Sequence, residues 1–373
     1  MVYLDYAAGE KIDDYVLNLY TKYLKECYPN PNSNHTLGKK MNEMIEDASK
    51  KYLTYLNLGD SYEIVYTSGA TESNNLALKG TAHRYRNFGK KIIISSMEHT
   101  SITASAEYLS REGYEILVCP VKDNGRLDLD ALKSMMNYDV ILVSVTSLDS
   151  ELSIKQDLKE VLNITKNYKN AHVHTDASSI VGKTDFDFNG IDLITIAPHK
   201  FGGVGDLGLL VKKKDVYLDS EISGGRSTTI YRAGSPNTPS ILANVEALKK
   251  ALEDRKENYK YVESLYNTII DNLKKYDKVH INNTYDSTPY IINFSVDSVS
   301  SNDLVKYLDD NKIYVSSKTS CCPINAPSKL VYALTKNKKL SSESIRISLS
   351  KNVSREDIEI FLNVLDNYLE KEI

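Results

Sequence analysis

Short apolar runs alternate with longer amphipathic stretches over roughly the first two thirds of the chain. The runs are rich in Val, Ile and Leu and predict buried strands at Glu63–Thr67, Lys91–Ser95, Glu115–Cys119, Val140–Val145, His172–Thr175, Leu193–Ile196 and Leu207–Val211. The amphipathic stretches predict helices at Glu72–Arg84, Ser101–Glu112, Leu129–Met136 and Asp157–Asn167. Short buried strands separated by helices indicate an α/β fold, with a mostly parallel sheet of seven strands that helices cover on both faces.

The pattern changes from about Ser240 onward. A helical pattern rich in Leu, Lys and Glu covers Ile241–Tyr276. After it we expect strands at Tyr290–Val296, Lys312–Val315 and Ser344–Leu349, and helices at Asn302–Asn311, Ser328–Leu334 and Arg355–Lys371. We therefore expect a large domain over residues 15–245 and a smaller α+β C-terminal domain, formed by residues 1–14 and 246–373.

Composition excludes several classes of protein. A net charge of −4, with lysines interspersed among carboxylates, does not suggest binding to nucleic acid. The sequence has no signal peptide pattern and no stretch long enough to span a bilayer, so we expect a cytoplasmic protein without direct membrane binding. Four cysteines without a CxxC pair predict neither a disulfide framework nor a metal site.

Four groups of polar residues follow predicted strands. Thr67–Asn75 turns through Gly69 into a helix, and the first amides of a helix favour an anion such as phosphate. An ordinary capped helix would give the same pattern. Lys200 stands between an apolar strand and a Gly-rich turn, where a partly desolvated amine can form a Schiff base. A surface lysine in a loop is the plainer interpretation.

The other two groups contain Asp176 and His99. Asp176 would keep the nitrogen of a pyridine ring protonated, or would cap a helix. The imidazole of His99 would stack on a flat ring and move protons, or serve a structural role. All four groups lie at the carboxyl ends of strands, where open α/β sheets bind their ligands. Their coincidence favours a common site over four unrelated features.

The chain resembles the NifS-like cysteine desulfurases, which belong to the class V aminotransferase group of fold type I pyridoxal-phosphate (PLP) enzymes. The resemblance runs nearly end to end. It is carried, in order, by the segments Tyr3–Ala8, Asn30–Gly38, Thr67–Asn75, His199–Lys200, Gly224–Gly225 with Arg232–Ser235, Val315–Cys321 and Ser344–Ser348. The resemblance implies a fold type I transferase fold.

The resemblance also implies a role for each matching residue. Lys200 would hold PLP covalently and later remove the α-proton of the substrate, Asp176 would pair with the pyridine nitrogen, and His99 would stack on the ring. Cys321 would attack the sulfur of L-cysteine and leave as a persulfide, with L-alanine as the other product. The remaining assignments are phosphate binding by Ala70, Thr71 and His199, joined by Ser235 from a second subunit of a homodimer, and carboxylate binding by Arg346.

Several positions depart from the family pattern. Asp149 and Ser150 replace the asparagines of an NNE run, and Ser179 replaces a glutamine that contacts the phenolic oxygen of PLP. We still expect Ser150 and Ser179 beside the cofactor, and Ser150 also beside the substrate. Ala197 replaces a phosphate-binding serine, and Lys318 replaces a glycine before Cys321. Short serine side chains would lose contacts or make them through water.

Three functions are compatible with these residues. The first is a cysteine desulfurase that passes sulfur to an acceptor protein, for iron–sulfur clusters, tRNA thiolation or a specialised pathway. The second is a related PLP lyase acting on selenocysteine or another thio amino acid without need of Cys321. The third is a degenerate paralogue that binds PLP and serves as a scaffold or regulator. The adjacent Cys322 could accept the persulfide or substitute for Cys321.

Overall fold

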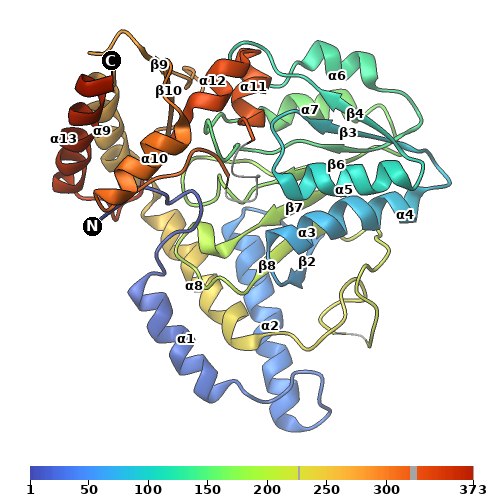
Figure 1. Cartoon of the computed structure of the whole chain (residues 1–373). Coiled ribbons are helices and arrows are strands. Elements are labelled where there is room, and N and C mark those ends of the chain that lie inside the picture. Colours follow the sequence, from blue (N-terminus) through green and yellow to red (C-terminus); the bar gives the residue numbers. More distant parts are fainter. Residues whose placement is uncertain (226, 320–325, 373) are drawn as a thin grey trace.

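A seven-stranded sheet forms the centre of the protein in this computed structural model, which describes residues 1–225, 227–319 and 326–372 (Figure 1). β8 runs antiparallel to both of its neighbours and the other strands are parallel to one another, so the predicted mostly parallel sheet is confirmed. The strand order is β2 (Tyr62–Thr67), β8 (Gly208–Lys213), β7 (Leu193–Ile196), β6 (His172–Asp176), β5 (Val140–Ser144), β3 (Lys91–Ser95) and β4 (Glu115–Cys119).

Alternation along the strands fills two separate cores. In β3, Ile93 packs with one face of the sheet, whereas Ile92 and Ile94 pack with the other. The first face is covered by α2 (Thr36–Tyr55), α6 (Leu129–Met135), α7 (Leu158–Thr165) and α8 (Thr238–Glu253), and the second by α3 (Ala70–Asn75), the π-helical turn η1 (Leu76–Gly80), α4 (Thr81–Tyr85) and α5 (Thr100–Arg111). Because both faces are covered, the central strands β5 and β7 are buried at every residue.

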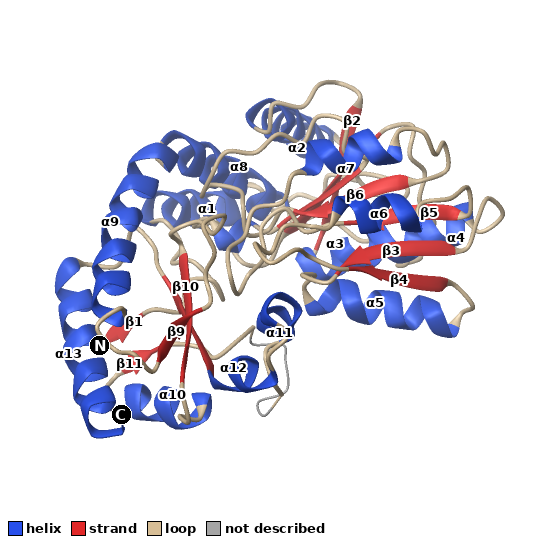
Figure 2. Ribbon diagram, turned by 90° about the horizontal axis from the view of Figure 1, so that it is seen from above, coloured by secondary structure: helices blue, strands red, loops and turns tan. Residues whose placement is uncertain are grey.

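A third core joins the two ends of the chain. Val2 and Leu4 pack with apolar residues of the C-terminal elements, and the first strand pairs with a strand near residue 313. These elements are β1 (Val2–Tyr3), α9 (Arg255–Leu273), β9 (Val279–Ile281), β10 (Ile291–Val296), α10 (Ser301–Asp310), β11 (Ile313–Tyr314), β12 (Ser344–Ser348) and α13 (Arg355–Glu372). Figure 2 shows them on the opposite side of the molecule from β3 and β4. The domain boundaries expected from the sequence stay a prediction.

Two helical predictions were wrong in detail. The helix expected at Glu72–Arg84 begins at Ala70 and contains the π-helical turn. Its Gly80 approaches the Asp219 carbonyl so closely that a Cβ would lie 2.8 Å from that oxygen. The continuous helix expected at Ile241–Tyr276 is two helices that meet at Asp254. The first helix packs on α1 (Asp14–Glu26) and α2, and the second packs on α13 and β10. Because the two helices pack on different elements, the chain changes direction between them.

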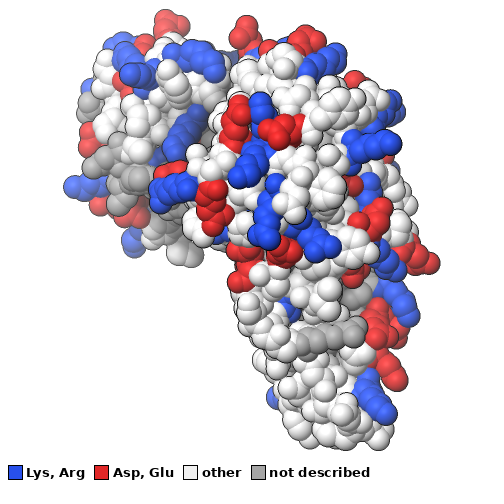
Figure 3. All heavy atoms as spheres, turned by 90° about the vertical axis from the view of Figure 1, so that its right-hand side faces the viewer, with Lys and Arg blue, Asp and Glu red and all other residues white. Residues whose placement is uncertain are grey.

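A small cluster links the sheet to the C-terminal elements beside the strand ends. Met97, Leu152 and Ile154 pack against Leu330 and Val331 of α11 (Lys329–Thr335), which precedes α12 (Lys338–Glu343). The face of the molecule in Figure 3 carries interspersed positive and negative side chains. None of the helices in the described part of the chain is long and apolar enough to cross a membrane.

Candidate active site

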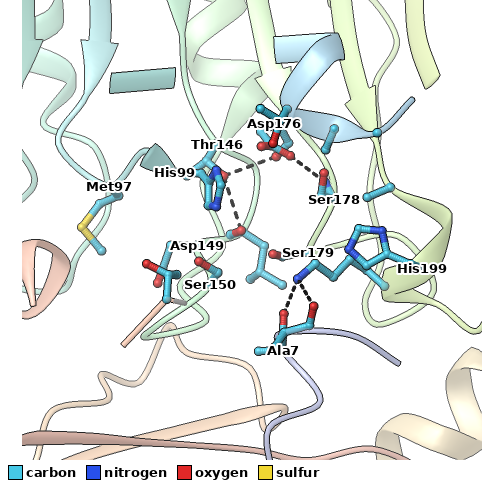
Figure 4. A pocket seen from close by; sticks show the side chains of 18 of the residues that line it. Ala7, Met97, His99, Thr146, Asp149, Ser150, Asp176, Ser178, Ser179 and His199 are labelled. Atoms are coloured by element: carbon cyan, nitrogen blue, oxygen red, sulfur yellow. Dashed lines mark hydrogen bonds between the residues drawn. The ribbon is translucent and has the colours of Figure 1, made fainter. Parts of the chain in front are cut away.

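The carboxyl ends of the central strands open into a cavity of about 390 Å³. It lies where the loops after β2, β3, β5, β6 and β7 meet the N-terminal segment and Arg346 of β12. Nine of the residues predicted from the sequence line it, namely Ala70, Thr71, His99, Ser150, Asp176, Ser179, His199, Lys200 and Arg346. The tertiary structure therefore brings together side chains from most of the length of the chain (Figure 4).

Lys200 ends a short 3₁₀ helix, Pro198–Lys200, directly after β7. Its Nζ donates to the carbonyl oxygens of Ala7 and Ala8, the latter at 3.0 Å. Burial, followed by the positive charges of Lys183 and Arg346, lowers the pKa of Lys200 to about 8. A lysine with this pKa is unprotonated often enough near neutral pH to act as a nucleophile or a base.

Asp176 is the last residue of β6 and is nearly buried. Its Oδ2 accepts from Asn74 Nδ2 at 2.8 Å, and its Oδ1 accepts from the Ser178 amide at 2.9 Å. Asn74 Nδ2 also donates to Ser101 Oγ at 2.8 Å. These contacts fix the carboxylate in one orientation at the edge of the cavity, where it can face a cationic ring nitrogen.

The loop before α3 provides backbone amides at another wall of the cavity. Gly69 precedes the helix, and Ala70 and Thr71 begin it, where backbone N–H groups have no carbonyl partner one turn earlier. Glu72 holds the loop, because its Oε2 accepts from the Ser68 amide at 2.8 Å and its Oε1 accepts from Arg232 Nε at 2.8 Å. This arrangement can bind an anion such as phosphate.

His99 is the N-cap residue of α5, and its Nδ1 accepts from the Ser101 amide at 3.2 Å. An Nδ1 that accepts from an amide carries no proton, so the neutral imidazole has its proton on Nε2. Figure 4 shows His99 on the same side of the cavity as Asp176. His199 lies beside Lys200, and burial lowers the pKa of His199 to about 4, so this imidazole is neutral at pH 7.

Arg346 is almost fully buried in β12. Its Nη1 donates to the Ser150 carbonyl at 2.9 Å, and its Nη2 forms an ion pair with Asp5 Oδ1 at 2.6 Å. Its Nε is buried and has no hydrogen-bond partner in the described structure. Because Arg346 lines the cavity, its guanidinium group lies where a carboxylate can bind.

Comparison with known proteins identifies the family of the chain. The sequence profile of the family described as "Aminotransferase class-V" matches residues 2–361. The chain belongs to this family. The Dictyoglomus turgidum protein named "Cysteine desulfurase IscS" is 32% identical over 99% of this chain and 95% of its own length. A Lactobacillus delbrueckii protein named "NifS/IcsS protein homolog" is 31% identical over 98% of this chain and 96% of its own length.

Solved structures of related proteins share the whole fold. A structure titled "NIFS-LIKE PROTEIN" has a TM-score of 0.92 and 29% identity, and it covers 99% of both chains. A NifS-like protein from Rickettsia africae has a TM-score of 0.88 and 27% identity, again over 99% of both chains. The fold type I architecture predicted from the sequence is therefore confirmed.

Within this class V aminotransferase, the replacement of asparagine at position 149 has a structural consequence. Asp149 Oδ1 accepts from the amides of Glu151 and Leu152 at 2.9 and 2.6 Å, and Oδ2 accepts from the Ile154 amide at 2.7 Å. An asparagine has one acceptor oxygen and would lose the contact made by the second. Burial nevertheless raises the pKa of Asp149 to about 6, so its charge titrates in the slightly acidic range.

Ser150, Ser179 and Ala197 all line the cavity, so the three shortened positions face the same space. Ser235 lies elsewhere, in a smaller hollow behind the loop before α3, where its Oγ accepts from Asn30 Nδ2 at 3.3 Å. Ser235 does not line the main cavity, and the phosphate contact expected of it stays a prediction. Cys321 and Cys322 lie outside the described residues, so the role predicted for Cys321 stays a prediction.

Sequence reasoning missed several residues of the site. It assigned no role to Asn74, although Asn74 is part of the Thr67–Asn75 motif, or to Glu98, the neighbour of His99. Glu98 is fully buried and accepts from Ser95 Oγ at 2.8 Å and from the Thr146 amide at 2.7 Å. Lys200 also contacts the backbone carbonyls of Ala7 and Ala8. Every residue type has a backbone carbonyl, so the sequence gives no sign of these contacts.

Proposed function

We propose that the chain is a PLP-dependent cysteine desulfurase, which converts L-cysteine to L-alanine and transfers the sulfur to one of its own cysteines. The observation that carries this proposal is the opening of Lys200, Asp176 and Arg346 onto one cavity. The full-length relatives named cysteine desulfurase support it. The L-cysteine substrate, the homodimer and a sulfur-acceptor protein are parts of the same proposal.

The residues of the cavity fit PLP. Lys200 offers a buried amine, Asp176 a fixed carboxylate for the ring nitrogen, and the amides of Ala70 and Thr71 a site for the phosphate. His199 stays neutral beside the amine, and His99 would stack on the ring. Bound PLP supplies an electron-withdrawing ring that stabilises negative charge at the α-carbon of the amino acid.

Lys200 and Arg346 would handle the amino acid. Arg346 binds the carboxylate, while Asp5 and the Ser150 carbonyl hold the guanidinium in place. Lys200 accepts the α-proton at its Nζ and returns it, because a pKa of about 8 makes both directions accessible near neutral pH.

Cys321 would receive the sulfur. Its thiolate attacks the sulfur of the substrate, an S–S bond forms, and the bond between Cβ and sulfur breaks. The electron pair of that bond stays on carbon and takes up a proton, so cysteine and one enzyme thiol become alanine and one enzyme persulfide. An acceptor protein would then take the outer sulfur. We place these steps in the cytoplasm.

We also propose a homodimer in which each subunit completes the other's phosphate site. Ser235 does not line the cavity of its own chain, although the family pattern assigns it to the cofactor phosphate. Ile222 and Ile230, in the segment before Ser235, are 41% and 67% exposed. Apolar side chains this exposed are consistent with a surface that a second subunit covers.

An absorbance spectrum tests the proposal directly. The purified protein with PLP should absorb in the near-ultraviolet or visible range, and L-cysteine should change that spectrum while L-alanine accumulates. Lys200→Ala should lose the adduct that borohydride reduces. A reduced adduct on a different lysine, or a spectrum that cysteine leaves unchanged, would contradict the assignment.

Cysteine variants separate the desulfurase from the related lyase. Persulfide formation should fail in Cys321→Ser and persist in Cys322→Ser. The reverse result would make Cys322 the acceptor. Full alanine release by the double variant would instead favour a lyase that needs neither thiol.

A further inference from the structure

Glu151 is a fully buried carboxylate in the turn that follows β5, directly after the cavity residue Ser150. We propose that Glu151 is a positioning residue, which fixes both ends of the segment that carries Cys321 and Cys322 relative to the substrate-binding arginine. The inference rests on the proposed desulfurase function, because it assigns the sulfur-accepting thiol a fixed place of attachment.

The carboxylate binds both sides of that segment. Glu151 Oε1 accepts from the amide and the hydroxyl of Thr319, each at 3.0 Å, and Oε2 accepts from Ser328 Oγ at 2.5 Å. Thr319 and Ser328 are themselves buried, so water competes little for these contacts. Thr319, which precedes the two cysteines in the sequence, and Ser328, which follows them, are therefore held by one side chain.

The turn that carries Glu151 is also fixed to the substrate site. Asp149 accepts the three amides described above, and the Ser150 carbonyl accepts from Arg346 Nη1 at 2.9 Å. The backbone of Arg346 pairs with Ser316, with N···O distances of 3.2 and 2.6 Å. Arg346 therefore contacts both Ser316, three residues before Thr319, and Ser150, the residue before Glu151.

A second contact joins the two sides of the same segment. The ammonium group of Lys318 donates to the Ala326 carbonyl, and Ser316 Oγ donates to the Lys318 carbonyl at 2.8 Å. Lys318 stands where the family pattern has glycine, and its side chain is buried. In this chain the lysine therefore adds a contact across the segment that a glycine would lack.

Under the proposed function, these contacts would keep the sulfur-accepting thiol near the cavity. A thiol must come within bonding reach of the substrate sulfur and must later reach an acceptor. A short tether with fixed ends keeps the local concentration of the thiol at the cavity high, and a tether that loses an anchor samples a larger volume. Anchoring through Glu151 would thus affect sulfur transfer more than binding of cofactor or amino acid.

Hydrogen exchange and single-turnover kinetics of the PLP-loaded protein test the proposal. In Glu151→Ala, exchange of the Thr319 amide should accelerate at least about tenfold, because that amide loses its acceptor. Persulfide formation after addition of L-cysteine should slow by about tenfold. The cofactor spectrum and the cysteine concentration at half-saturation should change less than about twofold.

Milder variants keep the test decisive if Glu151→Ala folds poorly. Thr319→Val and Ser328→Ala each remove one hydroxyl contact, and each should slow persulfide formation less than Glu151→Ala does. Ser328 also caps α11, since its Oγ accepts from the Val331 amide at 3.0 Å. Asn337→Ala is the matched control, because it removes the cap of the neighbouring α12 without touching the carboxylate.

The outcomes separate the two proposals. Unchanged exchange at Thr319, or equal losses of cofactor binding and persulfide formation, would overturn the role of Glu151. Slow persulfide formation in Asn337→Ala would also overturn it, because loss of a helix cap alone would then explain the slow persulfide formation of the other variants. If the unmodified protein forms no persulfide, the desulfurase proposal fails, and the exchange data alone decide whether Glu151 holds the segment.

Discussion

Lys183 is a second buried lysine close to Lys200. Together with Glu10 the two lysines line a small cavity of about 40 Å³ behind the main one. After burial, the charge of Lys183 contributes most to the lowered pKa of Lys200. Lys183 itself is balanced in part by the Glu10 carboxylate and lies 5.7 Å from the ring centroid of Tyr290.

We predict that Lys183→Met raises the pKa of Lys200 from about 8, because a repelling positive charge is removed. Attachment of PLP needs the unprotonated amine, so the pH midpoint of the attachment rate should move upward. Stopped-flow absorbance after mixing cofactor-free protein with PLP measures that midpoint. Lys351→Met is the control, since Lys351 lines the same small cavity but pairs with Asp13 and Asp254. An unmoved midpoint in Lys183→Met would contradict the prediction.

Glu98 gives the protein a pH-dependent stability. Burial raises the pKa of Glu98 from 4.5 to about 7, and its Oε2 has no hydrogen-bond partner in the described structure. Folding therefore favours the protonated form. The stabilisation is complete below about pH 4.5 and disappears as pH rises through about 7, with a total of about 3 kcal/mol.

We predict that Glu98→Gln removes this part of the pH dependence. Gln keeps an acceptor for the Thr146 amide but does not titrate. Between about pH 5 and pH 8, the free energy of unfolding of the cofactor-free protein should fall less in the variant than in the unmodified protein. Urea titrations at both pH values measure the difference. The exposed Glu359→Gln serves as control, and an identical pH dependence in Glu98→Gln would refute the assignment.

At the scale of elements, the start of β8 supports the loop that we assign to phosphate binding. Gly208 pairs with Thr67 across the sheet, and a Cβ on Gly208 would lie 2.3 Å from the carbonyl carbon of Gly69. The backbone atoms of Gly69 cannot move away from such a Cβ as the end of a flexible side chain could. The strand and the loop are therefore close only because residue 208 is glycine.

We predict that Gly208→Ala displaces this loop and weakens PLP binding by about tenfold or more, at a cost in stability of about 1–3 kcal/mol. Equilibrium titration of cofactor-free protein with PLP measures the affinity. Gly205→Ala is the matched control in the turn after Lys200, because its Cβ would meet nothing closer than His199 Cβ at 3.8 Å. Equal affinities of the two variants would argue against close packing of β8 and the loop.

At the scale of the whole molecule, the proposed dimer can be tested by mixing subunits. We predict that Ser235→Ala lowers PLP affinity by about tenfold, because a hydrogen bond to a charged group is lost. In a heterodimer of Lys200→Ala with Ser235→Ala, one site combines an intact Lys200 with the intact Ser235 of the partner. That site should bind PLP with normal affinity. Weak binding at every site of the heterodimer would mean that Ser235 does not act between subunits.

The sequence by itself determined the elements of the sheet and the type of chemistry. The bounds of β3, β4 and β7 match the prediction to the residue, because an apolar strand between polar turns is a local pattern. The sequence predicts a common site for Lys200, Asp176 and His99, because parallel strands present their carboxyl ends at one edge, and all three line the cavity.

Only the tertiary structure decided how these groups are held. The contacts of Lys200 with Ala7 and Ala8, of Arg346 with Asp5, and of Glu151 with both Thr319 and Ser328 join residues far apart in the chain. Packing also decided the break at Asp254, where two helices follow different partners. Local periodicity carries no information on such contacts, because burial and charge at each residue depend on neighbours that only the folded chain supplies.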